Sequence, residues 1–232
     1  TEAPKAPVDK RLMSNATAPA AIEQGNTAVQ DARKGQQAAL QASQQLQEMQ
    51  HSLDTLGDSG FLAQGAGFPD RVHLAKVVNT TFQMMGIEPP ISVDQVAAGE
   101  DLNKVTTRLG FALSQGLGSN NAASIVDDSI SAVPGGANSK AGAERIINAL
   151  EAINRRQIDY YNFITKWSGQ NNGSVLGADE YFNAHNPPEL YALSAYVPMD
   201  AMNMLRTHPE YAPQFNQKYG KGRDVAKYVL GR

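Results

Sequence analysis

Small and aliphatic residues recur at alternating steps of three and four over the first part of the chain. A repeat of 3.5 residues keeps one narrow face of a helix turned toward a partner helix, as in coiled coils. The spacing therefore predicts a long, coiled-coil-like helix over residues 18–57. We call this row the seam, and it consists of Ala18, Ala21, Gly25, Ala28, Ala32, Gly35, Ala39, Ala42, Leu46, Met49, Leu53 and Leu56.

The residues of the seam suggest association with identical helices. Alanine and glycine let helix axes approach closely but bury little apolar area, and Gly25 and Gly35 each cost about 1 kcal/mol relative to alanine in a helix interior. The flanking positions are rich in neutral glutamine, where a selective coiled coil carries Glu and Lys. We therefore expect a homo-oligomer. Its expected interface is Ala28, Ala32, Gly35, Ala39, Ala42, Leu46, Met49, Leu53 and Leu56.

The alternative is an amphipathic helix that folds back on its own domain. Two features favour association between chains. The seam is narrower than the apolar face of most globular helices, and it would be roughly 58 Å long at about 1.5 Å per residue.

The remaining chain is predicted to be all-α. Residues 1–17, with Pro4 and Pro7, read as a flexible arm, and the glycines of 58–69 as a hinge. Apolar residues at helical spacing then predict a multi-helix domain over 70–232 with a loop-rich C-terminal tail. Its expected helices cover about 69–85, 101–115, 122–133, 139–168, 178–184, 188–195, 200–206, 209–219 and 223–230.

The residue types exclude several kinds of chemistry. The chain has no cysteine, which excludes a disulfide framework, a cysteine-ligated zinc site and a thiol nucleophile. Its four histidines are scattered, no G-x-S-x-G or phosphate-binding glycine loop occurs, and no apolar run is long enough for a transmembrane helix. Asp127 and Asp128 are adjacent on a predicted helix and point about 100° apart, so we expect a solvated face there. We predict no catalytic site, no metal and no cofactor.

Two clusters could contact nucleic acid. The formal net charge of −3 excludes binding driven by bulk charge, but the C-terminal segment is locally basic. Its candidate phosphate contacts are Lys218, Lys221, Arg223 and Lys227, against the alternative of a solvated helix end. The aromatic residues between Tyr160 and Phe182 could stack on bases, although their helical spacing favours a place in the core.

Two stretches resemble proteins of tailed bacteriophages. The segment AGAERIINALEAINRRQIDYYNFITKWSGQNNGSVLGADEYFNAHNPPEL resembles one that recurs in structural and internal virion proteins. The ending HPEYAPQFNQKYGKGRDVAKYVLGR is similar to the closing segment of many such proteins, with matches at Gly220, Gly222, Ala226, Leu230 and Gly231. Together they cover roughly residues 139–232.

The resemblance implies a non-enzymatic virion component, of the internal or DNA-ejection type. Such a protein is packaged in the phage particle and can be delivered into the host envelope, where it contacts membrane only when assembled. Its implied partners are copies of itself, portal or tail proteins, and DNA. One alternative is a scaffold or adaptor of a tail or secretion-like machine. A peptidoglycan hydrolase is another, for which Glu144 and Glu151 are the mid-helix candidates for a catalytic acid.

Overall fold

The computed structural model describes residues 18–55, 69–84, 119–133 and 139–231. It is all-α, as predicted, and no β-strand occurs among these residues. The expected arm at 1–17, most of the hinge and the expected helix at 101–115 lie outside the described residues. The helices are α1 (Ala18–Thr55), α3 (Pro69–Met84), α6 (Asn120–Ser131), α7 (Lys140–Gln170), α8 (Ala178–His185), α9 (Pro188–Ser194), α10 (Met199–Thr207), the 3-10 helix η2 (Pro209–Tyr211), α11 (Ala212–Tyr219) and α12 (Ala226–Leu230).

Local signals set where these helices begin. Ser119 and Ser139 have extended backbones, and their hydroxyls accept hydrogen bonds from the amides of Ala122 and Gly142, at 3.3 and 3.0 Å. Such side chains satisfy amides that have no partner inside the helix. The predicted helices at 122–133 and 139–168 are therefore found within a few residues of their expected limits.

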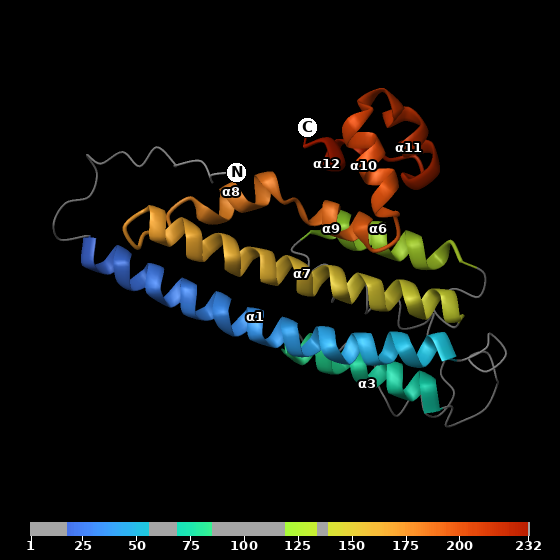
Figure 1. Cartoon of the computed structure of the whole chain (residues 1–232), viewed down its shortest axis with the longest axis horizontal. Coiled ribbons are helices and arrows are strands. Elements are labelled where there is room, and N and C mark those ends of the chain that lie inside the picture. The colour runs from blue at the N-terminus through green and yellow to red at the C-terminus, as the bar shows by residue number, and fades with distance from the viewer. Residues whose placement is uncertain (1–17, 56–68, 85–118, 134–138, 232) are drawn as a thin grey trace.

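Helix α7 is the centre of the fold (Figure 1). Helix α1 runs antiparallel along one side of it, and α3 packs on α1. Helices α6 and α9 cover the opposite side of α7, and α8 lies near its end. Helices α10 to α12 form a compact unit above α6 and α9, which we call the C-terminal subdomain. The main core joins α1, through Leu46, with α3, α6, α7, α9 and this subdomain.

The seam packs within its own chain. Ala39, Ala42 and Leu46 are fully buried, and Leu46 belongs to the main core. Ala32 packs on a second cluster that contains Ile164 of α7. The side chains of Met49 and Leu53, and all of Leu56, lie outside what the structure describes.

At Ala39, Ala42 and Leu46 the seam is covered by helices of the same chain, so these three positions do not require a helix from another chain. The physical reason is that α7 is itself long and amphipathic, so one chain supplies both helices. The small seam residues let the two axes approach closely. An interface between copies that requires Ala39, Ala42 or Leu46 to be exposed is not available in this fold, and helix α1 is part of the globular domain. The expected homo-oligomer and the other interface positions stay predictions.

The aromatic residues form core structure rather than an exposed stacking surface. Trp167 and Phe182 are buried, and Tyr160, Phe163 and Tyr181 are partly buried around them. The rings of Tyr160 and Phe182 meet edge to face, with centroids 5.2 Å apart. This cluster holds α8 against the end of α7, and the core interpretation of the sequence is confirmed for its buried members.

Candidate anion-binding cavity

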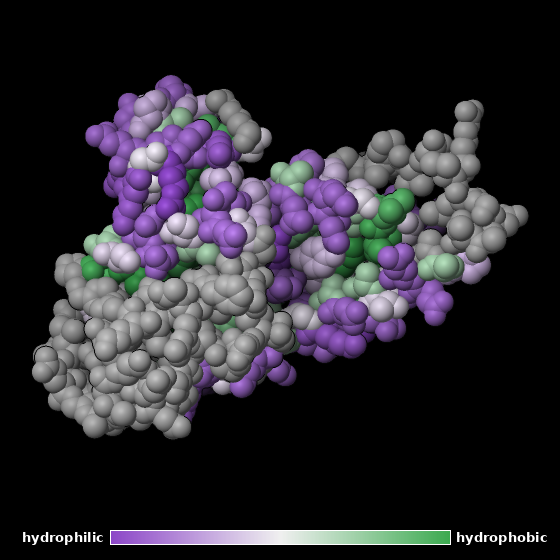
Figure 2. Space-filling model, turned by 180° about the vertical axis from the view of Figure 1, so that it is seen from behind, coloured by the Kyte–Doolittle hydropathy of each residue, from purple (hydrophilic) through white to green (hydrophobic). Residues whose placement is uncertain are grey.

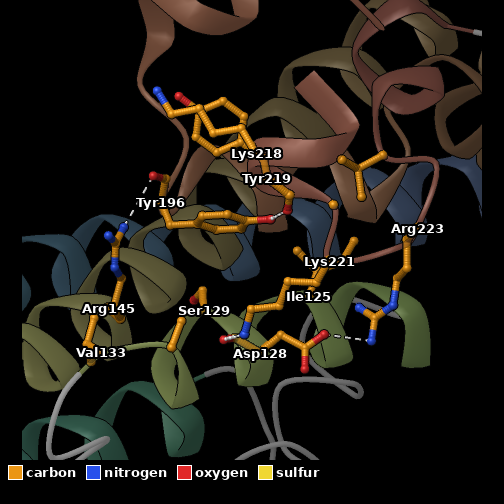
Figure 3. Close-up of a pocket in the computed structure, with 13 residues that line it drawn as sticks. Ile125, Asp128, Ser129, Val133, Arg145, Tyr196, Lys218, Tyr219, Lys221 and Arg223 are labelled. Atoms are coloured by element: carbon orange, nitrogen blue, oxygen red, sulfur yellow. Dashed lines mark hydrogen bonds and ion pairs between the residues drawn. The ribbon is translucent and has the colours of Figure 1, made fainter. Parts of the chain in front are cut away.

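A cavity of about 300 Å³ lies between α6 and the C-terminal subdomain (Figure 3). Its charged lining residues are Arg145, Lys218, Lys221, Arg223 and Asp128. Four basic groups and one acidic group make a formal charge of +3 around this small volume. The whole chain has a formal charge of −3, yet positive charge is concentrated at this one site.

A tight turn between α11 and α12 carries two of the cations. Lys221 and Gly222 have left-handed backbones, with φ of 46° and 86°. The amide of Arg223 donates to the carbonyl of Gly220 at 2.9 Å. Asn216 braces the turn from α11, because its Oδ1 accepts from the amide of Ala226 at 2.7 Å and its Nδ2 donates to Asp224 at 2.8 Å.

Residues of helix α6 bind the two cations of the turn. The guanidinium of Arg223 forms an ion pair with Asp128 at 2.7 Å and donates to the Ser124 hydroxyl at 2.8 Å. The Lys221 amine donates to the main-chain carbonyl of Asp128, near the end of α6 where the helix dipole favours a cation. Figure 3 shows both side chains reaching toward Asp128.

The two aspartates are therefore not simply a solvated face. Asp128 anchors the basic turn, and burial raises the pKa of the Asp127 carboxyl, with a further rise from the charge of Asp128. The expectation that the two carboxylates do not share a substrate stays a prediction. The sequence argument missed the role of Asp128 because the partner cation lies at the other end of the chain.

Arg145 closes the cavity from the α7 side. Its Nη1 donates to the carbonyl of Tyr196 at 3.2 Å, and the guanidinium lies 5.9 Å from the centre of the Tyr196 ring. The Tyr196 hydroxyl in turn donates to the carbonyl of Tyr219 at 2.8 Å. Helix α7, the loop after α9 and helix α11 are linked through these two side chains.

This arrangement suits binding of an anion better than catalysis. Arg145 has five N–H donors and Lys221 three, so the contacts described above leave donors for a ligand. Ser129 in the lining is buried, and its hydroxyl donates to the carbonyl of Val126 at 2.7 Å. A phosphate or carboxylate group is the natural ligand of several Arg and Lys side chains.

The structure brings together three of the four predicted nucleic-acid contacts. Lys218, Lys221 and Arg223 line the cavity, whereas Lys227 lies 4.9 Å from the centre of the Tyr228 ring and does not line it. The sequence argument missed Arg145, which lies on a distant helix and has no local signal. Lys218 lies 5.2 Å from the centre of the Tyr219 ring.

Glu144 and Glu151, the candidate acids of the hydrolase alternative, lie on α7 and are half-buried. Burial raises the pKa of Glu151, and the charge of Arg155 lowers it. Neither carboxyl lines the basic cavity.

Stability should fall in alkaline solution because of Tyr196. Burial raises the pKa of this hydroxyl from 10.0 to about 12. The folded protein keeps the proton that the unfolded chain loses above pH 10, so stability is fully present below pH 10 and is lost as the pH rises toward 12. The urea concentration at the midpoint of unfolding should decrease from pH 9 through 10.5 to 12. The midpoint of the Tyr196→Phe variant should decrease less steeply over the same series. Equal slopes for the two proteins would contradict this role of Tyr196.

A scan against protein-family models, a search of curated proteins and a search of solved structures each found no match. Within the described ranges, no group of three His, Asp or Glu residues is arranged to hold a metal ion. The same ranges contain no helix that combines the length and the apolar character needed to cross a membrane.

Proposed function

We propose that the protein is a non-enzymatic structural component of a tailed-phage particle, of the internal or DNA-ejection type. The observation that carries this proposal is the basic cavity, together with its place in the chain. All four cations come from residues 139–232, the part that resembles phage virion proteins. A packaged protein of this kind lies beside DNA at high concentration, and the cavity offers a positive site for a backbone phosphate.

The charge distribution supports a local contact rather than a general affinity for DNA. The net charge of −3 opposes non-specific accumulation of DNA over the whole surface. The cavity concentrates +3 at one place, so few phosphates would be contacted at once. Such binding should be weak and salt-dependent, since each neutralised phosphate releases counterions.

Association between copies, if it involves α1, must use the face that the fold leaves outside. That face is rich in glutamine and carries Ile22 and Leu40, which are 45% and 49% exposed. Figure 2 shows a largely hydrophilic surface over the visible described residues, with hydrophobic atoms gathered beneath the C-terminal subdomain and near the opposite end. We propose that self-association and contacts to portal or tail proteins use such faces, and that membrane contact arises only in the assembled form.

A scaffold or adaptor of a tail or secretion-like machine would use the same exposed faces. It differs from the first proposal in that it needs no DNA contact and does not leave the particle with the genome. The basic cavity favours the internal component over the adaptor.

Quantitative mass spectrometry of purified phage particles tests the proposal. We expect the protein in intact particles and its loss, relative to the major capsid protein, after DNA release has been triggered in vitro. The capsid protein serves as the control because it stays with the emptied shell. Retention after release would favour the adaptor, and absence from intact particles would exclude a virion role.

A further inference from the structure

A second cavity lies where α7, α8 and α9 meet, at the opposite end of α6 from the basic cavity. Its volume is about 600 Å³, within the range of small-molecule sites. The lining is polar and includes Arg156 and Tyr160 of α7, Asp179 and Asn183 of α8, and Glu189 of α9. None of the functions discussed so far uses these residues.

Glu189 is a buried acceptor at this cavity. The residue is only 8% exposed, and its Oε1 accepts a hydrogen bond from the Ser119 hydroxyl at 2.6 Å. Among the described residues, no other hydrogen bond to this carboxylate is found. The residue lies in the first turn of α9, where the helix dipole favours a negative charge.

Arg156 supplies donors that the protein does not use. Its Nη2 donates to Oδ1 of Asn183. Its Nε has no hydrogen-bond partner within the described structure but is fully buried, so the donors that a ligand can reach are those of Nη1 and Nη2. The guanidinium lies 5.4 Å from the centre of the Phe182 ring, which places it against an apolar surface. No ion pair joins it to Glu189 or Asp179 in the part of the chain that is described, so donor and acceptors stand separately around the cavity.

The opposite wall carries a second carboxylate. Asp179 accepts a hydrogen bond from the Tyr160 hydroxyl at 2.5 Å. The cavity therefore presents acceptors at Glu189 and Asp179 and a donor at Arg156. These three residues give a formal lining charge of −1.

The charges of Arg156, Glu189 and Asp179 favour a ligand without a net charge. An anion would be attracted to Arg156 but repelled by two carboxylates, and a cation would meet the guanidinium in the same small space. A hydroxyl group both donates and accepts, so a neutral ligand with several hydroxyls can satisfy all three side chains without an opposing charge.

We propose that this cavity binds a neutral, polyhydroxylated ligand of the carbohydrate class. Ligand hydroxyls donate to Glu189 and Asp179 and accept from Arg156, and Asn183 adds an amide at the rim. The open site has a polar lining and lacks a broad apolar surface, so the dissociation constant for a single sugar ring should be millimolar.

Three sugars with one ring skeleton test the proposal: glucose, glucosamine and glucuronate. Each is titrated into the ¹⁵N-labelled protein while the side-chain amide signals of Asn183 and Gln157, which both line the cavity, are followed. We expect glucose to shift these signals and to bind at least about threefold more tightly than either charged sugar. No shift at about 100 mM of any sugar, or tighter binding of a charged one, would overturn the proposal.

Variants separate binding from folding. Arg156→Met should weaken glucose binding about tenfold, the loss expected for a hydrogen bond to a charged group. Asn183→Leu changes an exposed residue and should also weaken binding even if the first variant folds poorly. Lys218→Ala, in the basic cavity, is the matched control and should bind as the wild type does. Wild-type affinity in a natively folded Arg156→Met or Asn183→Leu protein would contradict the assignment.

Discussion

Gly25→Ala is expected to destabilise the protein by about 3 kcal/mol, the upper range for an overpacked site. A β-carbon at Gly25 would lie 1.8 Å from the carbonyl oxygen and 3.0 Å from the carbonyl carbon of Gly173. Both atoms belong to the backbone of the turn after α7, so no side-chain rotation relieves the overlap. Helix α1 and this turn would have to separate. Urea unfolding, followed by the fluorescence of the single tryptophan at 167, measures the loss.

Gly35→Ala is the matched control on the same helix. The nearest atom to its β-carbon would be Oε1 of Gln157 at 3.5 Å, an ordinary contact with a flexible side chain. This variant should gain up to about 1 kcal/mol from the higher helix propensity of alanine. If both variants gained stability, the close contact of α1 with the turn after α7 would be wrong.

Gly220→Ala is expected to detach the basic turn from α6, at a cost of about 2–3 kcal/mol to the C-terminal subdomain. Its β-carbon would lie 2.3 Å from the carbonyl oxygen of Arg223 and 2.6 Å from that of Asn216. The backbone φ of −90° is open to any residue, so the clash alone causes the loss. Hydrogen exchange should accelerate over residues 216–226, and affinity for duplex DNA should fall because Lys221 and Arg223 leave the cavity.

Two controls distinguish the turn from general effects. Gly169→Ala has no atom within 4 Å of its β-carbon and should stabilise α7 by up to about 1 kcal/mol. Lys218→Ala should keep the fold and reduce the slope of log affinity against log salt by about 0.9, the value for one phosphate contact. Unchanged exchange in Gly220→Ala would contradict the described turn, and an unchanged salt slope in Lys218→Ala would remove that residue from the DNA contact.

Local patterns allowed the helices to be predicted. The helices depend on residues a few positions apart, chiefly apolar side chains three and four apart. A serine caps the start of α6 and of α7. The short α8 was expected at 178–184 and is found at Ala178–His185. The same reasoning placed Trp167 in the core, because its neighbours on one helix face are apolar.

The cavities depend on contacts between distant residues and could not be predicted. Lys221 and Asp128 are 93 residues apart in the chain, and Ser119 and Glu189 are 70 residues apart. No periodicity connects such pairs. The basic residues of the last segment indicated a positive site, but Arg145 and Asp128 enter it only after α6 and α7 have packed together.

By itself, the sequence determined the all-α class, the faces of the helices and the absence of thiol chemistry, because these follow from residue types and short spacings. Only the tertiary structure decided which helix covers the seam and which charges meet. A face with a 3.5-residue repeat is satisfied by any long apolar partner, and α7 of the same chain meets that requirement. The choice depends on contacts between helices that are distant in the chain, which no short spacing encodes.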